Sequence, residues 1–227
     1  MIMLTAKNAV HQVENLIQHY PKLSILESND KRFRLQGEIT VYRTASGFIL
    51  DRCYKIEIDI PIDSPELPSV IDLDKVIDDS YPHRYANGKL CLETDAIIRL
   101  RFIDGLGLIE WAEEFVETYF FSYEYYTRYG IFPFGERLHG ISGIIDTYQE
   151  LFQESNIKKV VSLMRYCADE AYRGHTTCPC GSGKKLRQCH GSVLLSYMRD
   201  SRKKEVVHMD VEMIRKALLT YESARKN

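Results

Sequence analysis

The sequence lacks the features that mark several common protein classes. No apolar run reaches the ~18 residues that a membrane-spanning helix requires, so no membrane partner is expected. The first residues lack the pattern of a secretory signal, and we therefore expect a cytoplasmic protein with reduced cysteines. Internal repeats and low-complexity tracts are also missing. Hydrophobic residues make up 44% of the 227 residues, which indicates a folded globular chain.

The chain also lacks a net excess of charge, because its formal charge is only −2. This balance hides an asymmetry: residues 173–227 hold 12 Lys and Arg against 5 Asp and Glu, whereas residues 1–172 hold 18 against 27. A basic C-terminal region can meet an acidic partner or neutralise the acidic remainder of the chain. No aromatic-interleaved basic motif accompanies it, so nucleic acid is not expected as a partner.

Hydrophobic periodicity predicts an α+β protein that begins with one helix and continues with strands. Residues 4–20 have helical spacing, whereas residues 33–41 and 54–60 alternate as half-buried strands do. A short apolar run follows within residues 66–74, and residues 79–91 have the composition of an irregular loop. Helical spacing returns after this loop, with an aromatic stripe that we expect to be core; the predicted helices cover residues 110–129, 141–152, 157–172, 193–198 and 211–221.

The strongest motif is a cluster of cysteines near the C-terminus. Four of the ligand types that zinc prefers fall within thirteen residues, namely Cys178, Cys180, Cys189 and His190. Four such ligands close a tetrahedron and leave no position for substrate, which is typical of a structural Zn²⁺ site. Glycines and a serine between the ligand pairs permit a sharp turn, and three basic residues in the same stretch can offset the thiolate charge. By contrast, Cys53 and Cys167 have the context of ordinary packing residues.

The segment from His175 to Gly191 resembles the SEC-C motif, a small zinc-binding element found at the C-terminus of the protein-translocation ATPase and in many unrelated bacterial proteins. The resemblance is carried by Cys-Pro-Cys-Gly-Ser-Gly-Lys-Lys and by the closing Cys-His-Gly. It implies a bound zinc ion and contact with a protein or a ribosome, but it does not imply catalysis.

A second cysteine, Cys91, follows the irregular loop and an Asn87-Gly88 turn. The run Asn-Gly-Lys-Leu-Cys-Leu, the proline nine residues before the cysteine and the Pro-containing segment at 64–70 together resemble the ubiquitin-conjugating enzyme family. That resemblance covers roughly residues 1–155. It implies a fold with an N-terminal helix, a four-stranded antiparallel meander and further helices, and it makes Cys91 a nucleophile that carries an acyl group as a thioester.

One position departs from the family pattern, because Tyr81-Pro82-His83 stands where the family has His-Pro-Asn. An imidazole can donate a hydrogen bond to an oxyanion or accept a proton, so His83 is a second catalytic candidate in either role. A histidine near the cysteine is similar to the pattern in prokaryotic relatives. For Glu93 and Asp95, just beyond the cysteine, a solvated surface is favoured over a catalytic role.

These resemblances predict two domains and a leading function. Residues 1–155 are expected to form the conjugating-type domain, and residues 156–227 a helical region that contains the zinc knot at 175–191. The leading hypothesis is a cysteine transferase that moves a protein C-terminus to an amine. The aromatic middle of the chain resembles conjugating-type proteins of bacterial antiphage (CBASS) operons, which makes a cGAS-like nucleotidyltransferase a candidate partner. The rival hypothesis is an inactive conjugating-fold adaptor that binds proteins through the zinc motif.

Overall fold

The computed structural model describes residues 4–136 and 138–224, and it forms two compact units. The first unit contains residues 1–93 and 104–136, and the second contains residues 94–103 and 137–227. The division therefore falls near residue 136 and not at the expected boundary after residue 155. The helix at 140–152 lies in the second unit because its Tyr148 and Phe152 are fully buried in the core of that unit.

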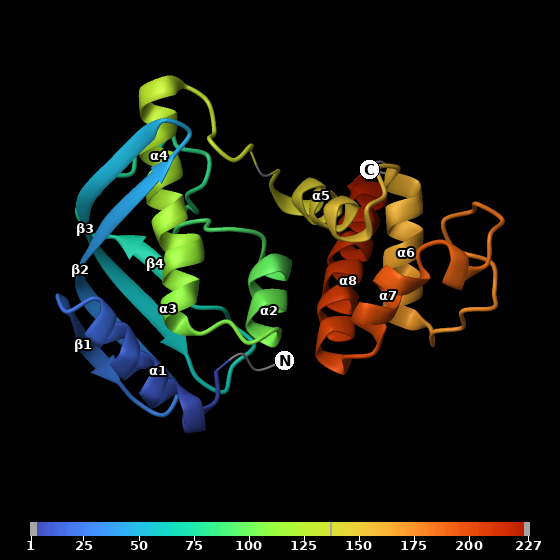
Figure 1. Ribbon diagram of the computed structural model, residues 1–227, viewed down its shortest axis with the longest axis horizontal. Helices are drawn as coiled ribbons and strands as arrows, with labels where there is room; N and C mark the ends of the chain where they lie inside the picture. Colours follow the sequence, from blue (N-terminus) through green and yellow to red (C-terminus); the bar gives the residue numbers. More distant parts are fainter. Residues whose placement is uncertain (1–3, 137, 225–227) are drawn as a thin grey trace. The chain divides into compact units, whose positions relative to one another are not determined.

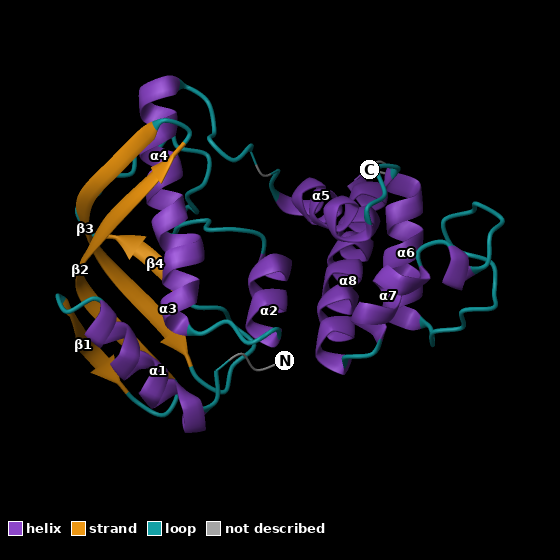
Figure 2. Ribbon diagram, in the orientation of Figure 1, coloured by secondary structure: helices purple, strands orange, loops and turns teal. Residues whose placement is uncertain are grey.

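The first unit is built on a four-stranded antiparallel sheet, drawn in orange in Figure 2. The strands are β1 (Leu23–Ser28), β2 (Arg32–Ala45), β3 (Phe48–Pro61) and β4 (Ser69–Asp72), and they pair in chain order. Alternating residues of β3 (Tyr54, Ile56, Ile58 and Ile60) are each at most 1% exposed, as their period of two predicts. The α+β class and the four-stranded meander are thus confirmed.

Helices cover the buried face of this sheet (Figure 1). Helix α1 (Ala6–His19) packs beside α3 (Leu108–Trp111), which continues through a π-helical segment, η1 (Ala112–Glu117), into α4 (Thr118–Tyr129). The aromatic stripe of this long helix is largely core, as expected: the ring of Phe120 stacks on Tyr54 of β3 with the centroids 4.0 Å apart. Trp111 and Phe120 are completely buried.

Two carboxylates of the long helix also attach it to its neighbours. Glu117 accepts a hydrogen bond of 2.7 Å from the hydroxyl of Tyr20, the residue that follows α1. Glu124 accepts from Tyr54 at 3.0 Å and pairs with Arg52, both of which belong to β3. These contacts hold the long helix in place over the sheet, and the loop that follows β4 is in turn attached to the same helix.

The second unit is helical and has its own core. It contains α2 (Asp95–Ile103), α5 (Gly140–Phe152), α6 (Ile157–Asp169), α7 (Gly191–Met198) and α8 (Ser201–Ala224), with the cysteine-rich knot between α6 and α7. Leu163 and Met164 of α6 and Leu194 of α7 are fully buried in this core, together with Val207 of α8. Among the described residues, no helix combines the length and the apolar character needed to cross a membrane.

Several elements differ from the sequence-based expectation. Strand β1 and helix α2 were not predicted, and α8 begins ten residues before the expected helix at 211–221. Strand β1 has only one buried residue, Leu23, so it carries no alternating hydrophobic signal. In α1, Ala9, Val13 and Leu16 form the buried face, whereas Val10 is 51% exposed although its spacing suggested core.

Candidate functional site

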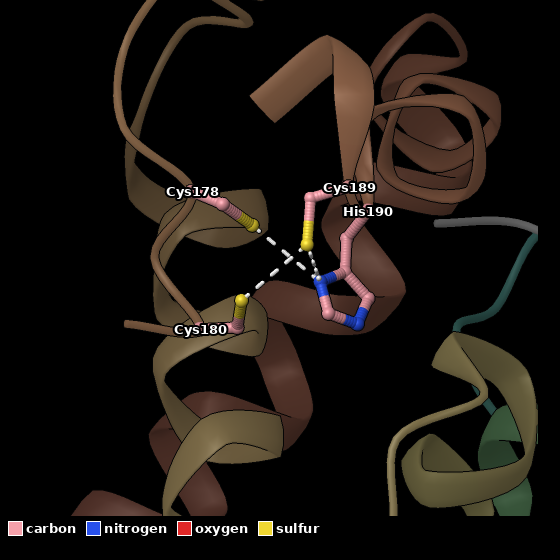
Figure 3. Close-up of side chains that lie close together, drawn as sticks. All are labelled: Cys178, Cys180, Cys189 and His190. Carbon is pink, nitrogen blue, oxygen red and sulfur yellow. Dashed lines mark hydrogen bonds between the residues drawn. The ribbon is translucent and has the colours of Figure 1, made fainter. Parts of the chain in front are cut away.

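The four predicted metal ligands converge at one point of the second unit. The Sγ atoms of Cys178, Cys180 and Cys189 and a ring nitrogen of His190 all lie within 4.8 Å of one another. Figure 3 shows the three sulfurs and His190 Nδ1 directed at a common centre. Cys178 and Cys180 are buried, and the other two ligands are partly exposed. The structure therefore brings together every ligand that the sequence singled out for a metal.

A tight turn supplies the first two ligands. The amide of Cys178 donates to the carbonyl of Lys184 at 2.8 Å, and the amide of Gly181 donates to the carbonyl of Cys178 at 3.1 Å. Gly181 and Gly183 have φ angles of +77° and +76°, a conformation that side chains rarely adopt. The chain can reverse within this turn because both residues are glycine.

The second ligand pair comes from the start of helix α7. A short 3₁₀ turn, η2 (Leu186–Gln188), leads into Cys189, and His190 is the residue before the first turn of α7. Leu186 is completely buried in the core of the second unit, which also includes Cys178 and Cys180. The knot is therefore attached to the helices and is not an independent appendage.

The spacing of the ligand atoms fits a tetrahedral metal site. Metal–sulfur bonds of ~2.3 Å and metal–nitrogen bonds of ~2.0 Å place the ligand atoms of a tetrahedron roughly 3.5–3.8 Å apart. Here Sγ of Cys180 lies 3.6 Å from Sγ of Cys189, and Nδ1 of His190 lies 3.4 Å from Sγ of Cys178 and 3.3 Å from Sγ of Cys189. The donor set and its spacing thus suit one metal ion that prefers four soft or borderline ligands.

The thiols of the cluster have different electrostatic environments. Burial raises the pKa of Cys178 to about 11. At Cys180 burial also acts to raise the pKa, but hydrogen bonds from Ser182, Cys178 and Cys189 together outweigh it and lower the pKa to about 6. A bound cation removes this difference because a coordinated thiol is deprotonated outright. The surface of the knot also carries three exposed positive charges, on Lys184, Lys185 and Arg187. These charges can offset the negative charge of the thiolates.

One further polar residue of this centre was not predicted. Oε2 of Glu154, in the connection between α5 and α6, lies 3.8 Å from Nε2 of His190. Both side chains are 14% exposed. No sequence pattern identifies this residue, because it lies 24 positions before the first cysteine and outside the motif.

The second candidate site is the loop that follows β4 and ends at Cys91. At the start of this loop, the buried carboxylate of Asp72 accepts a hydrogen bond of 2.8 Å from the amide of Ile77. Near its end, the amide of Leu90 donates to the carbonyl of Val70 in β4, and the Asn87–Gly88 turn lies just before it. Cys91 comes directly afterwards, outside the sheet and only partly buried. Partial exposure is one condition for a cysteine to react with a molecule from solvent.

The structure brings His83 and Cys91 together. A ring nitrogen of His83 and Sγ of Cys91 lie within 4.8 Å of each other. The amide of Cys91 donates to the carbonyl of His83 at 2.8 Å, and the hydroxyl of Tyr119 in α4 donates to the same carbonyl at 2.9 Å. One carbonyl oxygen therefore connects the backbone of the cysteine to a buried helix.

Aromatic side chains surround the imidazole of His83. Its ring meets Phe132 edge-on at 5.2 Å and Tyr81 at 5.5 Å between centroids. Tyr81 in turn contacts Tyr119 and Tyr123 edge-on. Burial raises the pKa of the Tyr119 hydroxyl far above its usual range, so this group remains a hydrogen-bond donor at every physiological pH. Part of the aromatic stripe predicted as core therefore also supports the loop.

The other cysteines and acids have ordinary surroundings. Cys167 is fully buried in α6, and burial raises its pKa to about 12. Cys53 is exposed on β3, where its sulfur lies 3.4 Å from the hydroxyl of Thr40. Asp95 is in α2 of the second unit and pairs with Arg99 one turn later. Asp95 therefore forms an ion pair within its own helix.

Comparison with known proteins identifies one part of the chain. Residues 176–192 match the SEC-C motif, which includes all four metal ligands and confirms that expectation. No curated protein and no solved structure matches the chain. The match and the geometry together assign a metal-binding SEC-C motif to the second unit.

Proposed function

We propose that the chain is a cysteine-dependent conjugating enzyme that carries the C-terminus of a protein as a thioester on Cys91 and transfers it to an amine. The single observation that carries this proposal is the position of Cys91. It lies outside the sheet at the end of an ordered loop, with a ring nitrogen of His83 within 4.8 Å of its sulfur. The order of α1, β1–β4, the irregular loop and Cys91 also follows the ubiquitin-conjugating pattern.

The proposed reaction has two balanced steps. In the first, the thiol of Cys91 loses its proton and Sγ attacks the carbonyl carbon of an activated C-terminus. The C–S bond forms, the bond to the activating group breaks, and that group leaves with the electron pair and takes up a proton. In the second, a lysine amine attacks the thioester, the C–S bond breaks, and the thiolate of Cys91 departs as an amide forms. The amine must lose a proton, and an oxyanion develops on the carbonyl during both steps.

In this proposal, His83 assists either the proton transfer or the stabilisation of the oxyanion. A neutral imidazole accepts a proton from the attacking amine, whereas an N–H of the ring donates to the oxyanion. The backbone carbonyl of His83 is held by Tyr119 and by the Cys91 amide, so the residue is anchored on two sides. This anchoring supports a role that requires a fixed orientation relative to the sulfur.

We propose zinc as the metal of the SEC-C motif, in a structural role. Three thiolates and one imidazole close the tetrahedron, so no coordination position remains for substrate. The proposed setting is the bacterial cytoplasm, in antiphage defence, with a cGAS-like nucleotidyltransferase as the candidate modifier or target. The cytoplasm also suits the donor set, because its reducing conditions keep the three thiols available to the metal.

A second candidate function is a binding adaptor that uses the conjugating fold without turnover. The observation that favours it is the metal knot itself, because exposed Lys184, Lys185 and Arg187 surround a closed site that has no catalytic position. In this case Cys91 would be dispensable, and the knot would carry the interaction with an acidic protein surface.

The experiment that separates the two functions uses a peptide with a C-terminal thioester as acyl donor and free lysine as acceptor. Intact-mass spectrometry should detect an adduct on the chain that thiols remove and that lysine consumes. Cys91→Ala should abolish it, whereas Cys53→Ala, which removes an exposed cysteine of the same unit, should not. Cys91→Ser should retain an ester that lysine consumes more slowly, because an alkoxide is a poorer leaving group than a thiolate. An unchanged lysine-consumable adduct in Cys91→Ala would remove the enzyme hypothesis and favour the adaptor.

A further inference from the structure

We propose that Glu154, which lies outside the SEC-C motif, is the outer partner of the metal ligand His190 and thereby ties the metal centre to the connection between α5 and α6. The inference rests on the proposal that the four ligands hold zinc, and it is independent of any transfer reaction at Cys91.

The two ring nitrogens of His190 face different partners. Its Nδ1 faces the sulfurs of Cys178 and Cys189 at 3.4 and 3.3 Å, as Figure 3 shows. The opposite ring nitrogen, Nε2, lies 3.8 Å from Oε2 of Glu154. With the metal on Nδ1, a neutral imidazole carries its proton on Nε2. This N–H is therefore directed at a carboxylate.

A carboxylate in this position performs two functions at a metal site. It fixes the orientation of the ring, and it raises the basicity of the ligating nitrogen by accepting the N–H on the far side. Both Glu154 and His190 are only 14% exposed, so water competes weakly for that N–H. At 3.8 Å the pair needs only a shift of less than 1 Å to form a normal hydrogen bond, whose length is about 2.7–3.2 Å.

The backbone and neighbouring side chains hold Glu154 in place. Its amide donates to the carbonyl of Gln149 at 3.1 Å, and its Oε1 accepts from the amide of Asn156 at 3.0 Å. Asn156 caps α6 by accepting from the amide of Lys159 at 3.2 Å. The first carboxylate oxygen is thus used by the turn, and the second faces His190.

Lys159 offsets the repulsion between the carboxylate of Glu154 and a negatively charged metal centre. Zinc with three thiolates carries a net charge of −1, so a nearby carboxylate would be repelled unless a cation accompanies it. The ammonium group of Lys159 lies 3.6 Å from Oε2 of Glu154, the same oxygen that faces His190. Lys159 and Glu154 therefore form an ion pair, and the carboxylate of this pair faces the N–H of the neutral His190.

The inference is tested on the full-length chain with Glu154→Gln and Glu154→Ala, and with Glu170→Gln as the matched control. Glu170 is an exposed carboxylate at the end of α6, so its replacement makes the same charge change in the same unit. Zinc affinity is measured by competition with a chromophoric chelator. We expect Glu154→Ala to bind zinc ~10–100-fold more weakly, the usual effect of losing an outer-shell partner. Glu170→Gln should match the wild type.

A second measurement separates a positioning role from simple damage to the turn. In the zinc-loaded protein with ¹⁵N-labelled histidine, the Nε2 proton of His190 should be visible and protected from exchange by Glu154. It should be lost in Glu154→Ala. Glu154→Gln retains an oxygen for the Asn156 amide, so amide exchange at Asn156 should remain slow while zinc affinity falls.

The outcomes distinguish this inference from the zinc proposal. If the wild type binds no zinc, both fail. If the wild type binds zinc and both Glu154 variants remain within twofold of Glu170→Gln, the outer-partner role alone is overturned. Equal protection of the Nε2 proton in wild type and Glu154→Ala would overturn it as well.

Discussion

The two cysteine-bearing loops of this chain are held in shape by different means. The knot around Cys178 has ligands that a single ion can join, and its buried Leu186 belongs to the core of the second unit. The loop that ends at Cys91 is held by hydrogen bonds to a sheet edge and a helix, chiefly through Tyr119 and Val70. In the proposed functions, a metal ion occupies the thiols of the knot, whereas the thiol of Cys91 must remain accessible to its substrate.

Loss of the metal should damage the second unit far more than the first. Structural zinc in comparable motifs contributes on the order of 10 kcal/mol of folding free energy. Because Cys178 and Cys180 share a core with α6, α7 and α8, Cys178→Ser should expose amides of these helices and not only those of the knot. Hydrogen exchange with and without a strong chelator measures this change. Exchange in residues 23–72 should stay the same, and uniform exposure of both units would contradict the comparison.

Replacement of His83 should reduce transfer while leaving the metal centre intact. Loss of an oxyanion donor typically lowers the rate ~10²–10³-fold, and loss of a general base ~10²–10⁴-fold. A single-turnover assay with the thioester peptide gives the rate for His83→Ala. His83→Asn tells the roles apart, because asparagine donates a hydrogen bond but cannot act as a base. Near-normal transfer in His83→Asn would favour the oxyanion role, and zinc content should be unchanged in both variants.

Acid should stabilise the second unit through Asp210. Burial raises the pKa of Asp210 to about 6, and the charge of Asp95 acts in the same direction, whereas the hydrogen bond from Tyr148 and the charge of Arg99 oppose it. The folded state binds this proton more tightly than the unfolded chain. The stabilisation is therefore fully present below the ordinary pKa of ~3.9 and is lost as the pH rises through about 6. The shift of about two pKa units corresponds to roughly 3 kcal/mol.

Asp210→Asn should remove this dependence and raise stability near pH 7, since an amide carries no charge to bury and its oxygen still accepts from Tyr148. Urea unfolding of the zinc-loaded protein between about pH 5.5 and 7.5 measures the effect, because more acidic conditions protonate the metal ligands and release the zinc. Asp200→Asn is the comparison variant, because Asp200 has its pKa lowered to about 2 by hydrogen bonds from Arg202 and is already ionised across this range. A pH dependence that persists in Asp210→Asn would assign it to another group.

The smallest expected effect belongs to the hydroxyl of Tyr119. Tyr119→Phe removes one hydrogen bond to the carbonyl of His83, worth ~0.5–1.5 kcal/mol, while the Cys91 amide still satisfies that carbonyl. The loop should loosen, so the alkylation rate of Cys91 by iodoacetamide should change by severalfold. Tyr129→Phe, at an exposed position of the same helix, should leave the rate unchanged. Zinc affinity should be the same in both variants.

The features that the sequence predicted are those whose residue pattern lies within one short segment of the chain. The alternation in β3 places Tyr54, Ile56, Ile58 and Ile60 in the core, and the close spacing of the four metal ligands identifies the knot without any knowledge of the fold. Strand β1 was missed because an exposed edge strand carries no alternating signal. Helix α2, with Arg99 buried among its apolar residues, shows no clear amphipathic stripe and was missed for the same reason.

Supporting residues could not be predicted because tertiary structure alone brings them to the sites. Tyr119 lies 36 positions from His83, and Glu154 lies 36 positions before His190, so neither spacing has a local pattern. The aromatic stripe correctly indicated core, but periodicity does not say which hydroxyl reaches a loop carbonyl. The position of the division between the units was likewise set by long-range packing of Tyr148 and Phe152.

The π-helical segment at Ala112–Glu117 has a consequence for how the long helix can vary. A turn with one extra residue rotates everything after it by about 100° relative to an uninterrupted α-helix. Trp111 and Tyr119 therefore keep their present directions only while that extra residue is retained. Deleting one residue from the segment would turn the hydroxyl of Tyr119 away from His83 even though every side chain of α4 was preserved. The length of this helix, as much as its composition, is thus under constraint from the loop that carries Cys91.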